Sequence, residues 1–194
     1  MIEHGERFSF GGENFVISVN AKDTPPSTSE AFTIEKNEPY VRVYEGLASA
    51  FSPRSILELG IFQGGSYVLL DKLFNPRRMS AVEISGQPVT PLLQYIADKE
   101  GRFVHFSTSP SDRKILEHIV RNELADELDL VMDDAPTLMN KQGRPLRFFS
   151  HCCDSVASTQ LRTGVGRTTL VTKHQMLPCP RATLCPTFCS NKSC

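Results

Sequence analysis

Hydrophobic positions in the central part of the chain alternate between a helical period and short buried runs. Residues 36–51 place Tyr40, Val43, Leu47 and Phe51 three and four positions apart, which predicts an amphipathic helix. Apolar runs of strand length follow at 55–60, 79–84, 102–106 and 128–132, and helical stretches lie between them at 67–74, 91–100 and 111–124. This alternation predicts an α/β fold with a doubly wound, mainly parallel sheet, and Ser111 is the expected N-cap of the last helix.

The segment before this region is mostly polar. It contains Gly11-Gly12 and the run Pro25-Pro26-Ser27-Thr28-Ser29, which are typical of loops. We therefore expect residues 1–35 to form a loose N-terminal arm or cap. Residues 36–135 then form the α/β domain.

The segment after residue 135 has a different composition. Thr, Ser, Pro and Cys dominate it, helical periodicity stops, and Asp154 is the one acidic residue among residues 151–194. It holds all the cysteines of the chain: Cys152, Cys153, Cys179, Cys185, Cys189 and Cys194. We expect residues 136–194 to form a disordered or irregular tail, and the domain before it to be incomplete.

Length and charge narrow the function classes. The chain has 194 residues, 40% of them hydrophobic, which is enough for one globular domain with a core. A net charge of −1 argues against a nucleic-acid partner. No apolar run approaches the ~18 residues of a transmembrane helix, and the first residues lack a secretory apolar stretch. We expect a cytoplasmic protein that binds a small molecule and does not contact a membrane. Whether it forms a homo-oligomer is left open.

Acidic residues fall where the predicted strands end. Glu58 lies beside the end of the first strand, Glu83 ends the second and Asp133 ends the fourth. Ligands of parallel α/β sheets bind at these carboxyl ends. The loop from Gly60 to Ser66 is rich in glycine, so a ligand can approach its backbone closely. An acid at the end of the second strand is placed to accept hydrogen bonds from two ribose hydroxyls.

The glycine loop does not have the pattern of a dinucleotide site. That pattern is G-x-G-x-x-G, whereas Gly60 and Gly64 are separated by three residues. The loop instead reads E-L-G-x-x-x-G-G-S. An acid two residues before the first glycine suits a ligand with a positive centre better than a pyrophosphate.

Three motifs together resemble a known family. ILELGIFQGGS (56–66), AVEIS (81–85) and DLVMDDA (129–135) resemble class I, Rossmann-like methyltransferases that depend on S-adenosylmethionine (SAM). The cephalosporin-hydroxylase-type and macrolide O-methyltransferase-like proteins are the most similar group, and the resemblance covers roughly residues 34–135. It implies a Rossmann-like fold, SAM as the cofactor, and O-methylation of a small or glycosylated metabolite.

The resemblance implies roles for single residues at the cofactor. Glu58 would lie near the amino-acid part of SAM, and Glu83 would hold the ribose. Ser109 or Asp112 would lie near the adenine. The loop residues along the cofactor would be Gly60, Phe62, Gly64, Gly65 and Ser66.

By the same resemblance, Asp133 would face the methyl-transfer site and is the candidate catalytic residue, and it is also counted with the cofactor-binding residues. Several relatives hold Mg²⁺ there, which would lower the pKa of the acceptor hydroxyl. Asp133 and Asp134 are the candidate ligands that this chain keeps. The His and the Glu-Asp pair that complete the site in the resembled group are missing. We therefore expect weak SAM binding at best and no turnover.

Each candidate also has a structural interpretation. Gly60 would then only end a strand, and Glu83 would be a solvated strand end. The pair at 133–134 would cap a helix. Asp112 would be a first-turn acid favoured by the helix dipole. His105 alternates with apolar residues, so we expect it to pack rather than to catalyse.

The genetic code offers an explanation for the change of composition near residue 135. If one base was lost there, the junction Met139/Asn140 forces a glutamate, and the junction Cys152/Cys153 forces a leucine. The restored frame can read D-D-A-S-H-L-Y-E-Q-T-R and, later, E-D-W-x-W-x-H, as in the resembled group. We therefore predict a frameshifted, non-native tail. The fourth strand would then become an exposed sheet edge, which favours aggregation.

Other interpretations stay open. Cys185 and Cys189 are spaced C-x3-C, but no paired C-x2-C motif supports a zinc module, and a disulfide framework conflicts with a cytoplasmic protein. For the whole chain, the alternatives are a nucleotide-binding oxidoreductase and a non-catalytic SAM- or nucleotide-binding remnant that acts as an interaction protein.

Overall fold

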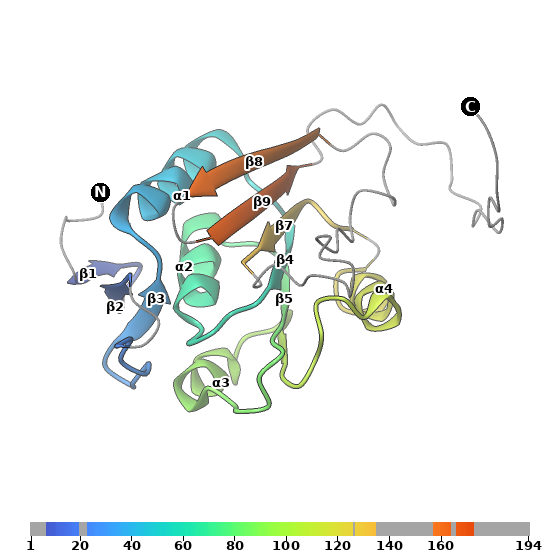
Figure 1. Ribbon diagram of the computed structural model, residues 1–194. Helices are drawn as coiled ribbons and strands as arrows, with labels where there is room; N and C mark the ends of the chain where they lie inside the picture. Colours follow the sequence, from blue (N-terminus) through green and yellow to red (C-terminus); the bar gives the residue numbers. More distant parts are fainter. Residues whose placement is uncertain (1–6, 20–22, 126, 135–156, 164–165, 173–194) are drawn as a thin grey trace, which may run out of the picture.

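The fold is centred on a mainly parallel sheet with helices on both faces (Figure 1). It is seen in a computed structural model, which describes residues 7–19, 23–125, 127–134, 157–163 and 166–172. The strand order is β6-β5-β4-β7-β9-β8. The parallel strands are β4 (Ser55–Leu59), β5 (Arg78–Val82), β6 (Arg102–His105) and β7 (Leu130–Asp133). The predicted α/β fold with a doubly wound parallel sheet is confirmed.

The helices cover the sheet in two layers. Helices α1 (Glu38–Ala50), α2 (Gly65–Phe74) and α3 (Thr90–Ile96) lie on one side, and α4 (Arg113–Asn122) lies on the other (Figure 1). Helix α3 is shorter than the predicted 91–100. Helix α4 begins later than predicted, because Asp112 and not Ser111 is its N-cap. The Asp112 carboxylate accepts hydrogen bonds from the amides of Lys114 and Ile115, which would otherwise lack partners in the first turn.

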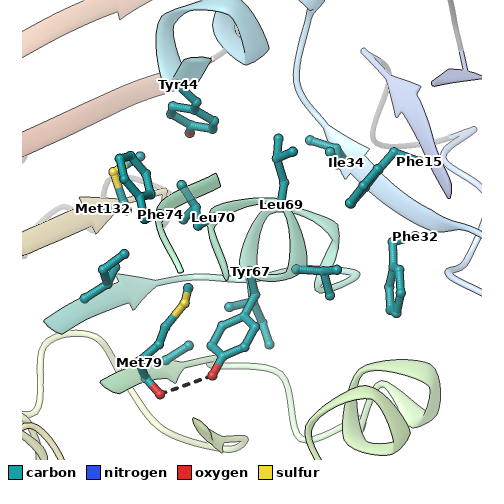
Figure 2. Close-up of a cluster of buried hydrophobic side chains, with 14 of the residues drawn as sticks. Phe15, Phe32, Ile34, Tyr44, Tyr67, Leu69, Leu70, Phe74, Met79 and Met132 are labelled. Atoms are coloured by element: carbon teal, nitrogen blue, oxygen red, sulfur yellow. Dashed lines mark hydrogen bonds between the residues drawn. The ribbon is translucent and has the colours of Figure 1, made fainter. Parts of the chain in front are cut away.

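Alternate residues of β4 face opposite layers. Ile56 belongs to the larger core cluster. Figure 2 shows Leu69 and Leu70 of α2 and Met79 of β5 in this cluster. Leu57 and Leu59 pack in a second cluster with Leu116 and Ile119 of α4. Both faces of this strand are therefore buried, as expected of a central parallel strand.

Strand β7 is not the edge of the sheet, so this expectation was wrong. It pairs in parallel with β4 on one side and antiparallel with β9 (Gly166–Thr172) on the other. Strand β8 (Ala157–Thr163) then pairs with β9. The backbone of this segment thus satisfies the hydrogen-bonding groups that β7 would otherwise expose. The six cysteines and the stretch 135–156, where the frameshift was inferred, lie outside the described residues.

The described residues of the N-terminal segment form a cap with three strands. Strands β1 (Arg7–Phe10), β2 (Glu13–Ser18) and β3 (Phe32–Glu35) form a separate sheet of order β1-β2-β3, which lies beside α2 (Figure 1). Its inner face consists of aromatic residues: the rings of Phe8 and Phe15 stack with centroids 5.0 Å apart, and Phe15 and Phe32 follow at 6.3 Å. Burial of these rings against the α2 layer holds the cap in place.

A buried ion pair ties α2 to β6. The Asp71 carboxylate accepts hydrogen bonds from Arg102 Nε at 2.6 Å and from the Tyr95 hydroxyl at 2.7 Å. Arg102 also donates to the carbonyl of Pro76 at 2.7 Å. A buried charge pair of this kind is stable only when its other polar atoms are also satisfied, and here they are.

In the described part of the chain, no helix combines the length and apolar character that a bilayer crossing requires.

Candidate cofactor site

The sheet topology places its switch point at the carboxyl ends of β4 and β7. Strands β5 and β6 lie on one side of β4 in the sheet, and β7 lies on the other side. Crossovers on both sides of one strand make a switch point, and the loops after the two strands there diverge. The loop after β4 begins at Gly60, and Asp134 follows β7, where its amide donates to the Leu59 carbonyl at 2.9 Å. The sequence prediction of a site at this edge is consistent with this topology.

The loop after β4 has an unusual backbone. Gly60 and Gly64 have φ of +81° and +76°, and Phe62 between them has φ of +50°. Glycine adopts this left-handed region freely, whereas a residue with a Cβ does so at a cost of about 1–2 kcal/mol. Gly60 thus leads from the end of β4 into a turn that is closed by a bond from the Gly64 amide to the Ile61 carbonyl at 2.7 Å, which agrees with its structural interpretation as a strand-ending turn. Its role along the cofactor stays a prediction.

Glu83 holds this turn from the end of β5. Its Oε2 accepts hydrogen bonds from the amides of Ile61 and Phe62, both at 2.9 Å, and its Oε1 accepts from the Ser85 amide at 2.8 Å. The residue is 7% exposed, so the interpretation as a solvated strand end was wrong. A carboxylate has about four acceptor positions, and three are used by backbone amides. A role of Glu83 at a ribose stays a prediction.

Glu58 is a buried carboxyl without a hydrogen-bond partner. It is fully buried, and neither of its side-chain oxygens has a partner among the residues that the structure describes. Burial above all, together with the nearby Asp134 carboxylate, raises the pKa of Glu58 to about 8. The Ser66 hydroxyl and the Lys36 ammonium oppose this shift. Glu58 therefore keeps its proton at neutral pH, because nothing in the described chain fully compensates the charged form of this buried carboxyl.

Lys36 and Tyr44 belong to the same cluster, and sequence reasoning missed both. Lys36 Nζ lies 2.7 Å from Asp134 Oδ1, and the Tyr44 hydroxyl donates to Asp134 Oδ2 at 3.4 Å. The ammonium also lies 5.5 Å and 5.9 Å from the ring centres of Tyr40 and Tyr44. The one available signal was the spacing of the two tyrosines, which places them on one face of α1 beside Lys36. Tyr44 points into the core in Figure 2.

The residues present do not fit Mg²⁺. One Asp134 oxygen is taken by the Lys36 ammonium, and a cation there would face a cation. Among the residues that the structure describes, no group of three or more His, Cys, Asp or Glu side chains is placed to hold a metal. Asp133 is half-buried at the end of β7, in register with Leu59. Its catalytic role stays a prediction.

Two loop residues of the predicted set serve packing. A Cβ on Gly65 would lie 2.2 Å from the Thr33 carbonyl oxygen of β3, so the glycine lets the cap approach α2. A Cβ on Gly64 would lie 2.8 Å from Leu92 Cδ2 of α3. Part of the glycine-rich pattern that was attributed to the cofactor is thus explained by close approach of neighbouring elements.

The predicted adenine residues make local contacts before α4. The Ser109 side chain accepts from the Ser111 amide at 3.2 Å, and the Ser109 carbonyl accepts from the Asp112 amide at 3.0 Å. Asp112 is the N-cap of α4, which is one position before the first turn where its structural interpretation placed it. An adenine contact of either residue stays a prediction.

His105 is engaged elsewhere, on the α4 side of the sheet. Its Nε2 lies 2.8 Å from Glu123 Oε1, and the Ser80 hydroxyl donates to Glu123 Oε2 at 2.7 Å. Burial alone would raise the pKa of Glu123, but these hydrogen bonds outweigh it and hold the pKa below its usual value. His105 therefore ties β6 to the end of α4.

Comparisons with known proteins give a weak likeness of fold. No protein-family model and no curated protein sequence matches the chain. Among solved structures, a methyltransferase from Geobacter sulfurreducens is similar with a TM-score of 0.41 and 12% identity, over 71% of this chain and 79% of that one. A ribosomal protein L11 methylase from Lactobacillus delbrueckii subsp. bulgaricus is similar with a TM-score of 0.39 and 14% identity, over 82% of this chain and 93% of that one. At such values, the function has to be argued from the chain's own residues.

Proposed function

We propose that the chain binds SAM at the carboxyl ends of β4 and β5 and serves, in its complete form, to transfer the methyl group. The observation that carries the proposal is Glu58, whose two oxygens have no hydrogen-bond partner in the described chain. A buried carboxyl in this state costs free energy unless a ligand supplies a donor or a positive charge. SAM carries an ammonium and a sulfonium cation, so it supplies both.

The surroundings of Glu58 support a ligand of this shape. The Gly60 turn leaves the backbone at the end of β4 open to close approach. Two large apolar side chains at the same edge are exposed, Phe62 by 41% and Ile84 by 54%. Exposed apolar side chains beside convergent polar groups are typical of binding sites. We propose that they cover the adenosine part of the cofactor, next to Glu83.

Bound SAM would supply a methyl group that its sulfonium already activates. The chain would then have to orient the cofactor, exclude water and accept the proton of the acceptor hydroxyl. Glu58 would release its proton to solvent as the cofactor binds, and its carboxylate would then hold the cationic amino-acid end. Asp133, at the end of β7, is the group that we propose for the acceptor's proton. The acceptor would be a small or glycosylated metabolite with a hydroxyl group. Because the chain departs from the resembled group after residue 135, we expect binding without turnover.

Isothermal titration of the purified chain with SAM, NAD⁺ and ATP tests this proposal. We expect SAM to bind, and Glu58→Gln to weaken it by about 10-fold to 100-fold, as when a charged hydrogen bond of ~1.5–3 kcal/mol is lost. Glu117→Gln, at an exposed glutamate of α4, is the matched control and should bind as the wild type does. Binding of NAD⁺ instead of SAM would point to an oxidoreductase. Absence of binding to all three ligands would favour an interaction protein.

A further inference from the structure

The Gly60–Gly64 turn requires support from outside itself. Phe62 occupies the left-handed region at φ +50°, which its Cβ disfavours. Backbone conformations of this kind persist only where the surrounding structure fixes them. Glu83 provides one support, because it accepts from the amides of Ile61 and Phe62. Glu83 does not hydrogen-bond to the next residue of the turn, Gln63, so the backbone there requires a second support.

That second support comes from Ser27 of the N-terminal cap. The Ser27 hydroxyl donates to the Gln63 carbonyl at 2.7 Å and accepts from the Thr33 amide at 2.8 Å. The Ser27 amide donates to Gln63 Oε1 at 3.2 Å. Ser27 is 8% exposed, so these bonds are shielded from water. Pro25 and Pro26 precede it and restrict the backbone that presents the hydroxyl.

The cap also lies close to Gly65, which follows the turn and begins α2. Thr33, which donates to Ser27, places its carbonyl oxygen where a Cβ of Gly65 would lie. The loop before β3 therefore contacts the turn through Ser27, and β3 itself contacts the start of α2 through Thr33. The position of the cap and the conformation of the turn cannot change independently.

We propose that Ser27 is a positioning residue for the cofactor, so that the N-terminal cap forms part of the cofactor site. The inference rests on the proposed function of the Gly60–Gly64 turn. Without the Ser27 hydroxyl, the Gln63 carbonyl loses its donor, and the turn relaxes toward conformations that Phe62 prefers. The cofactor then binds only the fraction of molecules whose turn is formed, and its apparent affinity falls by that fraction.

Ser27→Ala tests the inference, with Thr28→Ala as the matched control. Thr28 is the neighbouring residue of the same loop, and its hydroxyl accepts from the amides of Glu30 and Ala31 without reaching the turn. Two quantities are measured: the affinity for S-adenosylhomocysteine by titration calorimetry, and the hydrogen exchange of the peptide 60–66 by mass spectrometry. A urea titration of each variant reports global stability.

We expect Ser27→Ala to weaken binding at least 10-fold and to accelerate exchange in residues 60–66, whereas Thr28→Ala changes neither. A purely structural role would lower the urea midpoint but leave affinity and local exchange as in the control. Gln63→Met, which removes the acceptor of the Ser27 amide, should have a smaller effect in the same direction, and serves if Ser27→Ala does not fold.

The outcomes separate the inference from the function on which it rests. A wild-type chain that binds neither SAM nor S-adenosylhomocysteine overturns the proposed function, and the inference with it. A wild-type chain that binds, together with a Ser27→Ala variant of equal affinity and unchanged exchange, overturns the inference alone.

Discussion

The buried carboxyl of Glu58 should make the stability of the chain depend on pH in an unusual direction. Its pKa is about 8 in the folded chain and close to 4.5 when the chain is unfolded. Between these values the folded state keeps a proton that the unfolded state has released, so stability falls as the pH rises. The slope is about 1.4 kcal/mol per pH unit, and the whole window is worth at most about 5 kcal/mol. The charged groups that face Glu58 are Asp134, Lys36 and Glu83.

Glu58→Gln removes the titrating group while keeping its shape. Urea unfolding of both proteins from pH 5 to pH 8 gives the free energy of unfolding at each pH. The chain contains five histidines, which also titrate in this range, so the informative quantity is the difference between the two proteins. We expect the free energy of unfolding of Glu58→Gln, relative to that of the wild type, to increase by about 1 kcal/mol for each pH unit above pH 5.

The matched control is Glu117→Gln, at an exposed glutamate in α4 that pairs with Arg113. Its free energy of unfolding should run parallel to that of the wild type over the same pH range. If the Glu58→Gln curve is also parallel to the wild type, then Glu58 ionises in the folded chain much as it does in water. The argument that its burial is uncompensated would then be wrong.

Two further substitutions test the packing that surrounds the site. Gly65→Ala should destabilise by about 2 kcal/mol or more, because its Cβ would overlap the Thr33 carbonyl; Gly46→Ala, in an open position of α1, should stabilise by about 0.5–1 kcal/mol. Equal urea midpoints for these two variants would contradict the close approach of β3. Asp71→Ala should destabilise by about 3–5 kcal/mol, since it leaves the Arg102 guanidinium buried without a counter-charge. A loss under about 1 kcal/mol in urea unfolding would show that the pair is solvated.

Local patterns in the sequence predicted the parts of the fold that depend on them. The alternation of helical and strand periods gave the parallel sheet, and the acid after the second strand led to Glu83. The N-terminal strands were missed because they are short and the loop-type residues between them dominated the interpretation. The alternation of Arg7 and Ser9 with the buried Phe8 was the signal that could have found the first one. The cap of α4 was misplaced by one residue, because Ser and Asp are both good N-caps and only the hydrogen bonds distinguish them.

Pairings between distant segments could not be predicted. The Lys36–Asp134 contact joins the start of α1 to the end of β7, and nothing local in either segment indicates it. The bond from Ser27 to Gln63 is of the same kind. The pairing of β9 with β7 was not predicted, because the composition of the segment after residue 135 indicated a disordered tail. Backbone hydrogen bonds between strands do not require apolar side chains, so composition could not exclude this pairing. The frameshift itself stays a prediction, to be tested on the coding DNA.

The aromatic face of the N-terminal cap has a consequence for biosynthesis. A ribosome releases Phe8, Phe15 and Phe32 well before the α2 segment that covers them. Until that segment emerges, the nascent chain presents phenylalanine rings to water, and the free energy of burying them against α2 is not yet available. Exposed apolar surface on an incomplete chain is what chaperones bind and what drives aggregation. The cap should therefore fold late, although it is synthesised first.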